Sequence, residues 1–180
     1  GQFKHNEQSV RIVERLEKDG NGLNLTWEVR DGILNHEMEL RAATLEGRVV
    51  RLSDKIAYLN ADFDDAIRAQ LLSEDDIPIE LRKELGYNTK TRLDHMIHDI
   101  ITNSMNHDDI VMSPATEEAF LELRQFMFKH LYTNPIAKSE EKKAEAMLQE
   151  LYFHYMDEPQ DLPEKMRRLM DEGEEKSRAV

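Results

Sequence analysis

The sequence predicts an all-α protein built as a multi-helix bundle, and three observations support this fold class. Apolar residues recur at spacings of three and four along almost every segment, which is the period of an amphipathic helix. The alternating pattern of a half-buried β-strand is missing. Helix caps and breakers leave only short connections between the segments. Because 180 residues can form one core, residues 1–180 are expected to form a single domain.

Breakers and caps set the first three predicted helices. The first covers 8–18 and is broken by Gly20-Asn21-Gly22. Thr26 is a suitable N-cap for a second helix that runs towards Leu40, with Glu28 in its first turn. A continuous apolar stripe predicts a third, long helix over 45–72.

Proline, glycine and serine mark the predicted helix ends in the rest of the chain. Pro78 and Gly86 frame a short helix, because proline favours the first turn and glycine the position past the end. Ser113 and Ser139 are suitable N-caps, each followed by helix-favouring residues. Helices are therefore predicted over 78–86, 91–106, 113–132 and 139–157, with a last, highly charged helix after Pro163.

Composition excludes several kinds of function. The net charge of −13 argues against broad binding of nucleic acids or anionic membranes, which needs clustered Lys and Arg. Because cysteine is absent from the sequence, the expected metal ligands are His, Asp and Glu. Neither an apolar run of about 18 residues nor a signal peptide is found, so a cytoplasmic protein is expected. The P-loop and G-x-S-x-G motifs do not occur.

The long helix predicted over 45–72 has two distinct faces. At about 100° per residue, its apolar side chains form one broad stripe. Acidic residues and a tyrosine lie within about 80° on the opposite side, bordered by a basic row. The apolar stripe consists of Leu45, Val49, Leu52, Ile56, Leu59 and Phe63. The polar face consists of Asp54, Tyr58, Asp62 and Asp65, and the basic row of Arg48, Arg51 and Lys55.

This polar face has two interpretations. In the first, it is a solvated helix surface whose charges pair at i, i+3 and i+4, as Arg51 could with Asp54. In the second, a carboxylate binds a divalent metal, basic side chains bind an anion and the tyrosine packs on an organic ring. Since Mg²⁺ and Mn²⁺ favour carboxylate and phosphate oxygens, the second interpretation predicts a phosphorylated substrate.

Several histidines offer other candidates for a site. His95, His98 and Asp99 have the spacing of ligands on one helix face, but neighbouring isoleucines favour an ordinary, partly exposed face. His36 has two interpretations, a side chain at a substrate cleft or a hydrogen-bonded structural histidine. The aromatic residues and histidines of the last third are expected in the core or at subunit contacts; they are Phe120, Phe126, Phe128, His130, Tyr152, Phe153, His154 and Tyr155.

Four segments together resemble one known family. They are FKHNEQSVRIVERL (3–16), GLNLTWEVRDGILNH (22–36), EGRVVRLSDKIAYLNADFDDA (46–66) and LRKELGYNTKTRLDHMIHDII (81–101). In this order they resemble the bacterial deoxyguanosinetriphosphate triphosphohydrolase-like proteins of the HD-domain superfamily, and the likeness extends through SPATEEAFLELRQFMF (113–128). The resemblance implies an HD-domain-like bundle. It also implies a metal-dependent enzyme that hydrolyses a dNTP, often dGTP, to deoxynucleoside and triphosphate.

The resemblance implies roles for four residues of the polar face. Asp54 matches the last of four ligands of a divalent metal such as Mg²⁺ or Mn²⁺, and Lys55 matches a lysine that contacts phosphate. Tyr58 matches a tyrosine that packs on the deoxyribose, where a 2′-hydroxyl would be crowded. Asp62 matches an aspartate that holds the 3′-hydroxyl.

Outside this face the match is looser. His5 matches a histidine near the scissile phosphate, although Asn6 stands where related enzymes have a glutamate. Arg124 and Tyr132 match a pair that contacts the triphosphate and the sugar. Ala61 stands where many members have a histidine.

Three expected metal ligands do not match this sequence. The family's first His and its His-Asp pair belong upstream of residue 3, whereas His98-Asp99 and His107-Asp108 follow Asp54. The chain is therefore expected to be the C-terminal part of a homo-oligomeric dNTP hydrolase, inactive by itself and with little affinity for the catalytic metal. The alternative is a non-catalytic helical regulatory or assembly module with a degenerate site.

Overall fold

The computed structural model describes residues 3–37, 39–135, 138 and 141–180, and every regular element in these ranges is helical. The predicted all-α class is therefore confirmed. Contacts between Cα atoms divide the chain into two compact units. Unit 1 comprises Gly1–Val10 and Thr26–Asn134, and unit 2 comprises Arg11–Leu25 and Pro135–Val180. A single domain over 1–180 stays a prediction.

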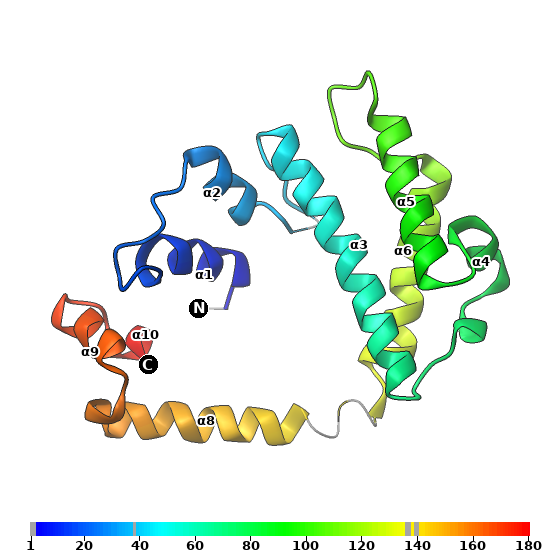
Figure 1. The fold of residues 1–180 in the computed structure, drawn as a ribbon. Helices are drawn as coiled ribbons and strands as arrows, with labels where there is room; N and C mark the ends of the chain where they lie inside the picture. Colours follow the sequence, from blue (N-terminus) through cyan, green and yellow to red (C-terminus); the bar gives the residue numbers. More distant parts are fainter. Residues whose placement is uncertain (1–2, 38, 136–137, 139–140) are drawn as a thin grey trace. The chain divides into compact units, whose positions relative to one another are not determined.

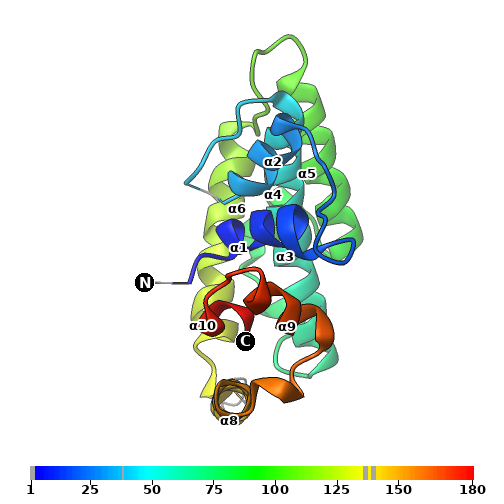
Figure 2. The same cartoon turned by 90° about the vertical axis from the view of Figure 1, so that its left-hand side faces the viewer.

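Unit 1 contains most of the helices (Figure 1). They are α1 (His5–Arg11, whose last residue belongs to unit 2), α2 (Trp27–Leu34), α3 (Leu45–Arg68), the 3₁₀ turn η2 (Glu74–Asp76), α4 (Ile79–Leu85), α5 (Thr89–Ser104), α6 (Pro114–Met127) and the π-helix η3 (Phe128–Tyr132). Helices α3, α5 and α6 run side by side, and α4 packs against α5 and α6 (Figure 2).

Side-chain caps fix where three of these helices begin. The Thr44 hydroxyl accepts a hydrogen bond from Gly47 N at 3.1 Å, and the Asn88 side chain accepts one from Thr91 N at 3.0 Å. Ser113, the predicted cap, accepts from the backbone at the start of α6. Thr26 is also an N-cap, as predicted, with extended backbone but without a capping hydrogen bond from its side chain.

The core of unit 1 lies between the C-terminal half of α3 and helices α4, α5 and α6. Its buried apolar residues are Ile56, Leu59, Phe63, Ile77, Leu81, Leu85, Met96, Ala119, Phe120, Leu123 and Met127. Arg92 is also buried, with 1% of its surface exposed. Its guanidinium donates to Asn60 Oδ1 at 2.8 Å and to Glu74 Oε2 at 3.2 Å, and lies over the Phe63 ring. These partners offset the cost of burying a charge.

The predicted apolar stripe of α3 is buried over only part of its length. Ile56, Leu59 and Phe63 are buried, whereas Leu45 and Val49 are 42% and 45% exposed. The expectation that the whole stripe faces the core is therefore wrong for the first turns. In the described part of unit 1, those turns pack chiefly on the short helix α2, which is too small to cover them.

Several helix ends differ from the prediction for local reasons. The first helix begins at His5, not residue 8, and continues after α1 as the π-helix η1 (Ile12–Leu16). Helix α2 ends at Leu34, where the Asn35 side chain donates to Asp31 O at 3.0 Å. Helix α3 ends at Arg68, because Gln70 takes a left-handed conformation and Leu71 N bonds back to Ala66 O.

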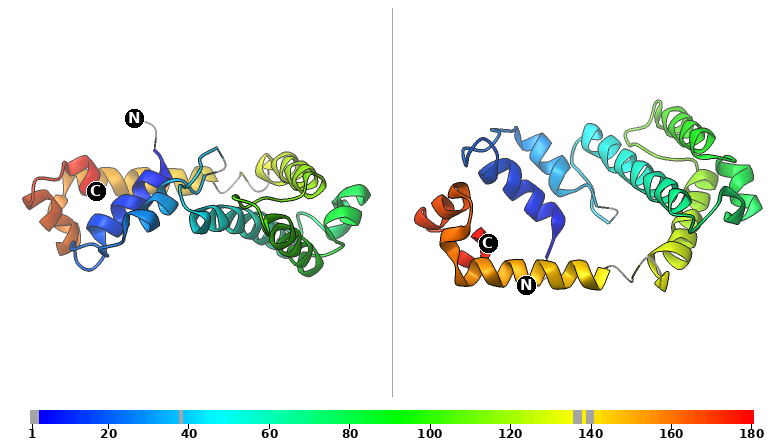
Figure 3. Two further views of the ribbon diagram at one scale, coloured as in Figure 1. Left: turned by 90° about the horizontal axis from the view of Figure 1, so that it is seen from above. Right: turned by 60° about the horizontal axis from the view of Figure 1, so that its bottom comes forward.

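Unit 2 contains η1 and the helices of the C-terminal segment (Figure 3). These are α8 (Glu141–Asp157), the 3₁₀ turn η4 (Pro159–Asp161), α9 (Glu164–Asp171) and α10 (Lys176–Ala179). The predicted cap Ser139 lies outside the described residues. The last charged helix is divided in two, because Gly173 adopts φ 98° after α9. None of the described helices is both long and apolar enough to span a bilayer.

Candidate functional site

The polar face of α3 lies on the surface of unit 1. The Asp54 side chain is 45% exposed, and Lys55 Nζ lies 3.1 Å from its Oδ2 atom. Arg48 instead bonds Asp109 at 3.0 Å, and Arg51 Nη1 donates to Leu40 O at 3.5 Å. Of the basic row, Lys55 is therefore the residue whose side chain contacts Asp54.

A cavity of about 500 Å³ opens between α3, α6 and η3. Lys55 and Tyr58 line it from α3, Arg124 from α6 and Tyr132 from η3. Leu59, Phe120, Leu121, Gln125 and Phe128 complete the lining. Four residues that the resemblance singled out are thus brought together by helices far apart in the sequence. A volume of this size is typical of a site for a small organic ligand.

Asp62 is hydrogen-bonded to Tyr132, which lines this cavity. The Tyr132 hydroxyl donates a hydrogen bond to Asp62 Oδ2 across a sequence separation of 70 residues. Burial, followed by the bond to Asp62 and its negative charge, raises the pKa of Tyr132 well above its usual value, and Tyr58 adds to the shift. Tyr132 is therefore a neutral donor at physiological pH, and the second oxygen of Asp62 remains an acceptor. Sequence reasoning missed this pair, since nothing in the local pattern links the two residues.

A second cavity, of about 580 Å³, lies between α1, α2 and α3. Asp54 and His36 both line it, together with Ser9, Glu28, Val29, Gly32, Ile33, Thr44, Glu46, Gly47 and Val50. Helices α2 and α3 approach closely here, because a Cβ atom on Gly47 would lie 3.3 Å from Gly32 Cα. Asp54, a residue of the polar face, therefore also lines this cavity.

The side chains of His36 and His5 contact one another within unit 1. Their Nε2 atoms are 3.1 Å apart, and His36 Nδ1 lies 2.7 Å from Ile33 O. His36 is therefore hydrogen-bonded, as the structural interpretation predicts, and it lines a cavity, while its place at a substrate cleft stays a prediction. Asn6 is buried and donates to Leu34 O at 2.8 Å, so it fastens α1 to the end of α2. His5 does not line the cavity that holds Lys55 and Arg124.

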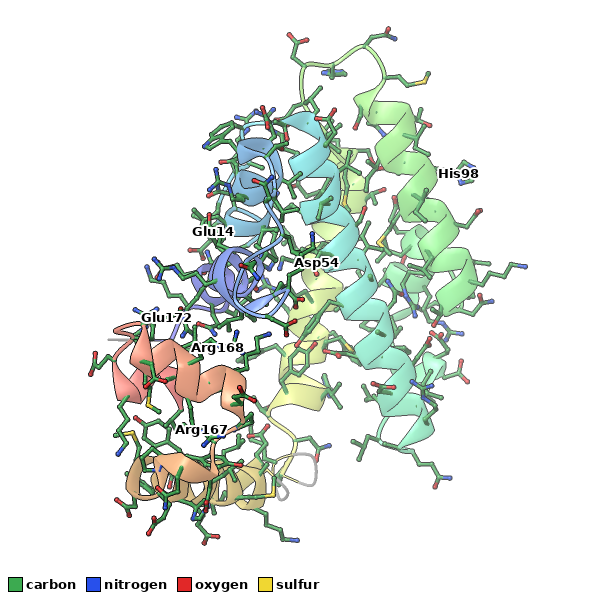
Figure 4. All side chains as sticks on the ribbon, turned by 60° about the vertical axis from the view of Figure 1, so that its left-hand side comes forward. Glu14, Asp54, His98, Arg167, Arg168 and Glu172 are labelled. Carbon is green, nitrogen blue, oxygen red and sulfur yellow. The ribbon has the colours of Figure 1, made fainter. Side chains whose placement is uncertain are left out.

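The later His-Asp candidates make structural contacts. His95 Nε2 lies 3.1 Å from the Thr116 hydroxyl, and Asp99 Oδ2 accepts a hydrogen bond from Ser113 N at 2.8 Å. His98 points outward from α5, whereas Asp54 lies on α3 (Figure 4). Across the part of the chain that the structure describes, no group of three or more His, Asp or Glu side chains could hold a metal ion. Asp54 fits a hard divalent metal as one carboxylate ligand, but the described donors do not form a complete site.

Comparison with known proteins identifies relatives over nearly the whole chain. Residues 110–180 match the family model of the phosphohydrolase-associated domain. A deoxyguanosinetriphosphate triphosphohydrolase-like protein of Caldanaerobacter subterraneus subsp. tengcongensis is 46% identical over 171 residues, which cover 95% of this chain and 50% of that protein. Proteins of the same name from Clostridium perfringens strain 13 and Clostridium tetani are each 41% identical, with 53% and 52% of their lengths covered.

The chain spans about half the length of the curated relatives that it matches. The similarity covers 95% of the chain, so it includes residues that line the cavity between α3 and α6. By its sequence, the chain is therefore similar over nearly its whole length to about half of these deoxyguanosinetriphosphate triphosphohydrolase-like proteins, and its C-terminal part matches a phosphohydrolase-associated domain.

Proposed function

We propose that this chain is part of a metal-dependent dNTP triphosphohydrolase, which releases a deoxynucleoside and triphosphate from dGTP or a related dNTP. The observation that carries the proposal is the cavity between α3, α6 and η3. It combines two cationic side chains, Lys55 and Arg124, with two tyrosines and a hydrogen-bonded carboxylate. Cations suit a triphosphate, whereas aromatic faces and a carboxylate suit a sugar with a free hydroxyl.

Each residue then has a defined task in binding. Lys55 and Arg124 balance the negative charge of the triphosphate that departs. Tyr58, which is 59% exposed beside the cavity, packs on the deoxyribose and disfavours a 2′-hydroxyl. Asp62 accepts a hydrogen bond from the 3′-hydroxyl, and the bond from Tyr132 holds its carboxylate in place.

The chemistry also needs a metal and a proton donor. In the whole enzyme, a divalent metal held in part by Asp54 would supply polarisation of the scissile phosphate and a water molecule of lowered pKa. Asp54 supplies one carboxylate to that metal, and Lys55, 3.1 Å from this carboxylate, stays at the phosphate end of the cavity. His5 gives a proton to the departing 5′-oxygen.

Restoring the unspanned half of a relative tests this function. The chain is joined to the corresponding half of the Caldanaerobacter protein, and the products from dGTP and Mn²⁺ are identified by chromatography. We expect inorganic triphosphate and deoxyguanosine, and a loss of at least about 100-fold in kcat for Asp54→Asn. The surface variant Asp94→Asn is the matched control and keeps full activity.

Two outcomes contradict the proposal. Release of phosphate or diphosphate in place of triphosphate contradicts the reaction. If the folded protein binds no dGTP and releases no product, the chain is instead a helical regulatory or assembly module with a degenerate site.

A further inference from the structure

The cavity between α1, α2 and α3 has a lining that is mostly apolar and partly exposed. All of its lining residues belong to unit 1. Val29 and Ile33 lie one turn apart on α2, and Val50 lines the cavity from α3. Val29 and Val50 are 47% and 54% exposed. Exposed apolar side chains gathered around a cavity indicate a surface that another protein segment covers.

The contact between α2 and α3 explains why these two helices do not fill the cavity themselves. They approach at two glycines, where a Cβ atom on Gly32 would lie 3.5 Å from Gly47 Cα. Because glycine has no side chain, the backbones come close at this point, but neither residue extends into the space beside it. Val29 and Val50 line that space and stay about half exposed. Their burial therefore requires a further segment beside the two helices.

Asp54 indicates which segment covers the cavity. It lines the same cavity, and the described residues hold no group of three or more His, Asp or Glu side chains that could bind a metal. Ligands of one hard cation each lie about 2 Å from it, so the residues that complete the proposed site must come within about 4 Å of the Asp54 carboxylate. The chain covers 50% of the length of the Caldanaerobacter protein. A segment from the other half that brings ligands to Asp54 would lie over this cavity.

We propose that the cavity between α1, α2 and α3 is the docking surface for the half of the relatives' length that this chain does not span. The occupant is a helix with an apolar face, which packs on Val29 and Val50. Glu28 and Glu46 are exposed and also line the cavity, so basic residues beside that apolar face match the surface. This inference rests on the proposed function, because it uses Asp54 as a metal ligand.

Thiol labelling tests this surface, because the chain contains no cysteine and an introduced thiol reports on one position. Val29→Cys and Val50→Cys are made in the 180-residue chain and in the same chain joined to the unspanned half of the Caldanaerobacter protein. Peptide mass spectrometry follows their alkylation by iodoacetamide. We expect joining to slow alkylation at both positions by at least about ten-fold. Ile97→Cys and Ile101→Cys on α5, where the parent residues are 49% and 55% exposed, are the matched controls and react equally fast in both proteins.

Labelling needs no catalysis, so it separates this inference from the proposed function. Protection of both thiols in a joined protein that hydrolyses no dGTP supports the docking surface while the proposed function fails. Equal rates in the isolated and the joined protein would show that the other half docks elsewhere. Thiols that already react slowly in the isolated chain, or more slowly as its concentration rises, would mean that this chain or a second copy covers the cavity, and would also overturn the proposal. Circular dichroism of each variant confirms that the helices are retained.

Discussion

The two halves of α3 differ in how far neighbouring helices bury their apolar side chains. In the C-terminal half, Phe63 and Leu59 are buried, and Asp62 has a partner on another element, Tyr132. In the N-terminal half, Val49 is 45% exposed, and Asp54 lines the cavity that α1 and α2 share with α3. The cavity that we propose for the sugar and the phosphates is therefore lined by residues of this chain, whereas among the described residues Asp54 is the one proposed metal ligand.

The largest predicted effect tests the buried half. Phe63→Ala should lower the free energy of unfolding by about 4 kcal/mol, because it leaves a cavity among α3, α5 and α6. Val49→Ala, on the same stripe but 45% exposed, should cost less than about 1 kcal/mol. Urea denaturation measures both. Equal losses would show that the two halves of α3 are not different.

Substitution of Arg92 tests the buried polar contacts of the C-terminal half of α3, where Arg92 bonds Asn60. Arg92→Leu should cost about 2 to 3 kcal/mol, because Asn60 and Glu74 lose their charged partner. Lys90→Leu, an exposed neighbour on α5, is the control and should change stability by less than about 0.5 kcal/mol. A neutral result for Arg92→Leu in urea denaturation would mean that the guanidinium is not part of the core.

Tyr132 should make stability depend on high pH. Its pKa is raised in the folded chain, so the stabilisation is fully present below the unfolded value of 10.0 and is lost as pH rises above it. Tyr132→Phe should cost about 1 kcal/mol at pH 7, because Asp62 loses a donor. Stability curves from pH 7 to 11 should fall less steeply for the variant. Parallel curves for the two proteins would contradict this account.

The smallest predicted effect on stability concerns Asp109, which bonds Arg48 in the N-terminal half of α3. The backbone N–H of Ile110 and the guanidinium of Arg48 hold the pKa of Asp109 below its usual value. This stabilisation is present above the unfolded pKa of 3.8 and is lost as pH falls below it. Asp109→Asn should therefore reduce the acid-induced loss of stability slightly between pH 5 and about 2, as measured by circular dichroism. A larger acid sensitivity in the variant would be the opposite result.

Local patterns in the sequence predicted the helices and the polar face of α3, but not which residues distant in the sequence contact α3. Ser113 and Gly86 mark helix ends because capping and positive φ are local requirements. Lys55 and Tyr58 share a face by helical period. Arg92 was missed, because a charged residue is usually exposed and its partner Glu74 lies 18 residues away.

The pairing of His5 with His36 was missed for the same reason, since it depends on how α1 meets the end of α2. The proposed ligand Asp54 stays a prediction, because periodicity places it on a polar face but cannot supply the other ligands of a metal.

The most direct test of the central claim is dGTP binding to this 180-residue chain without a divalent metal. We predict that dGTP binds weakly and shifts the NMR signals of Tyr58, Arg124 and Tyr132, whereas GTP shifts them less. Tyr58→Ala should remove the difference between the two nucleotides. If dGTP shifts none of these residues, or only signals around the apolar first turns of α3, the site for the sugar and the phosphates is not where we place it.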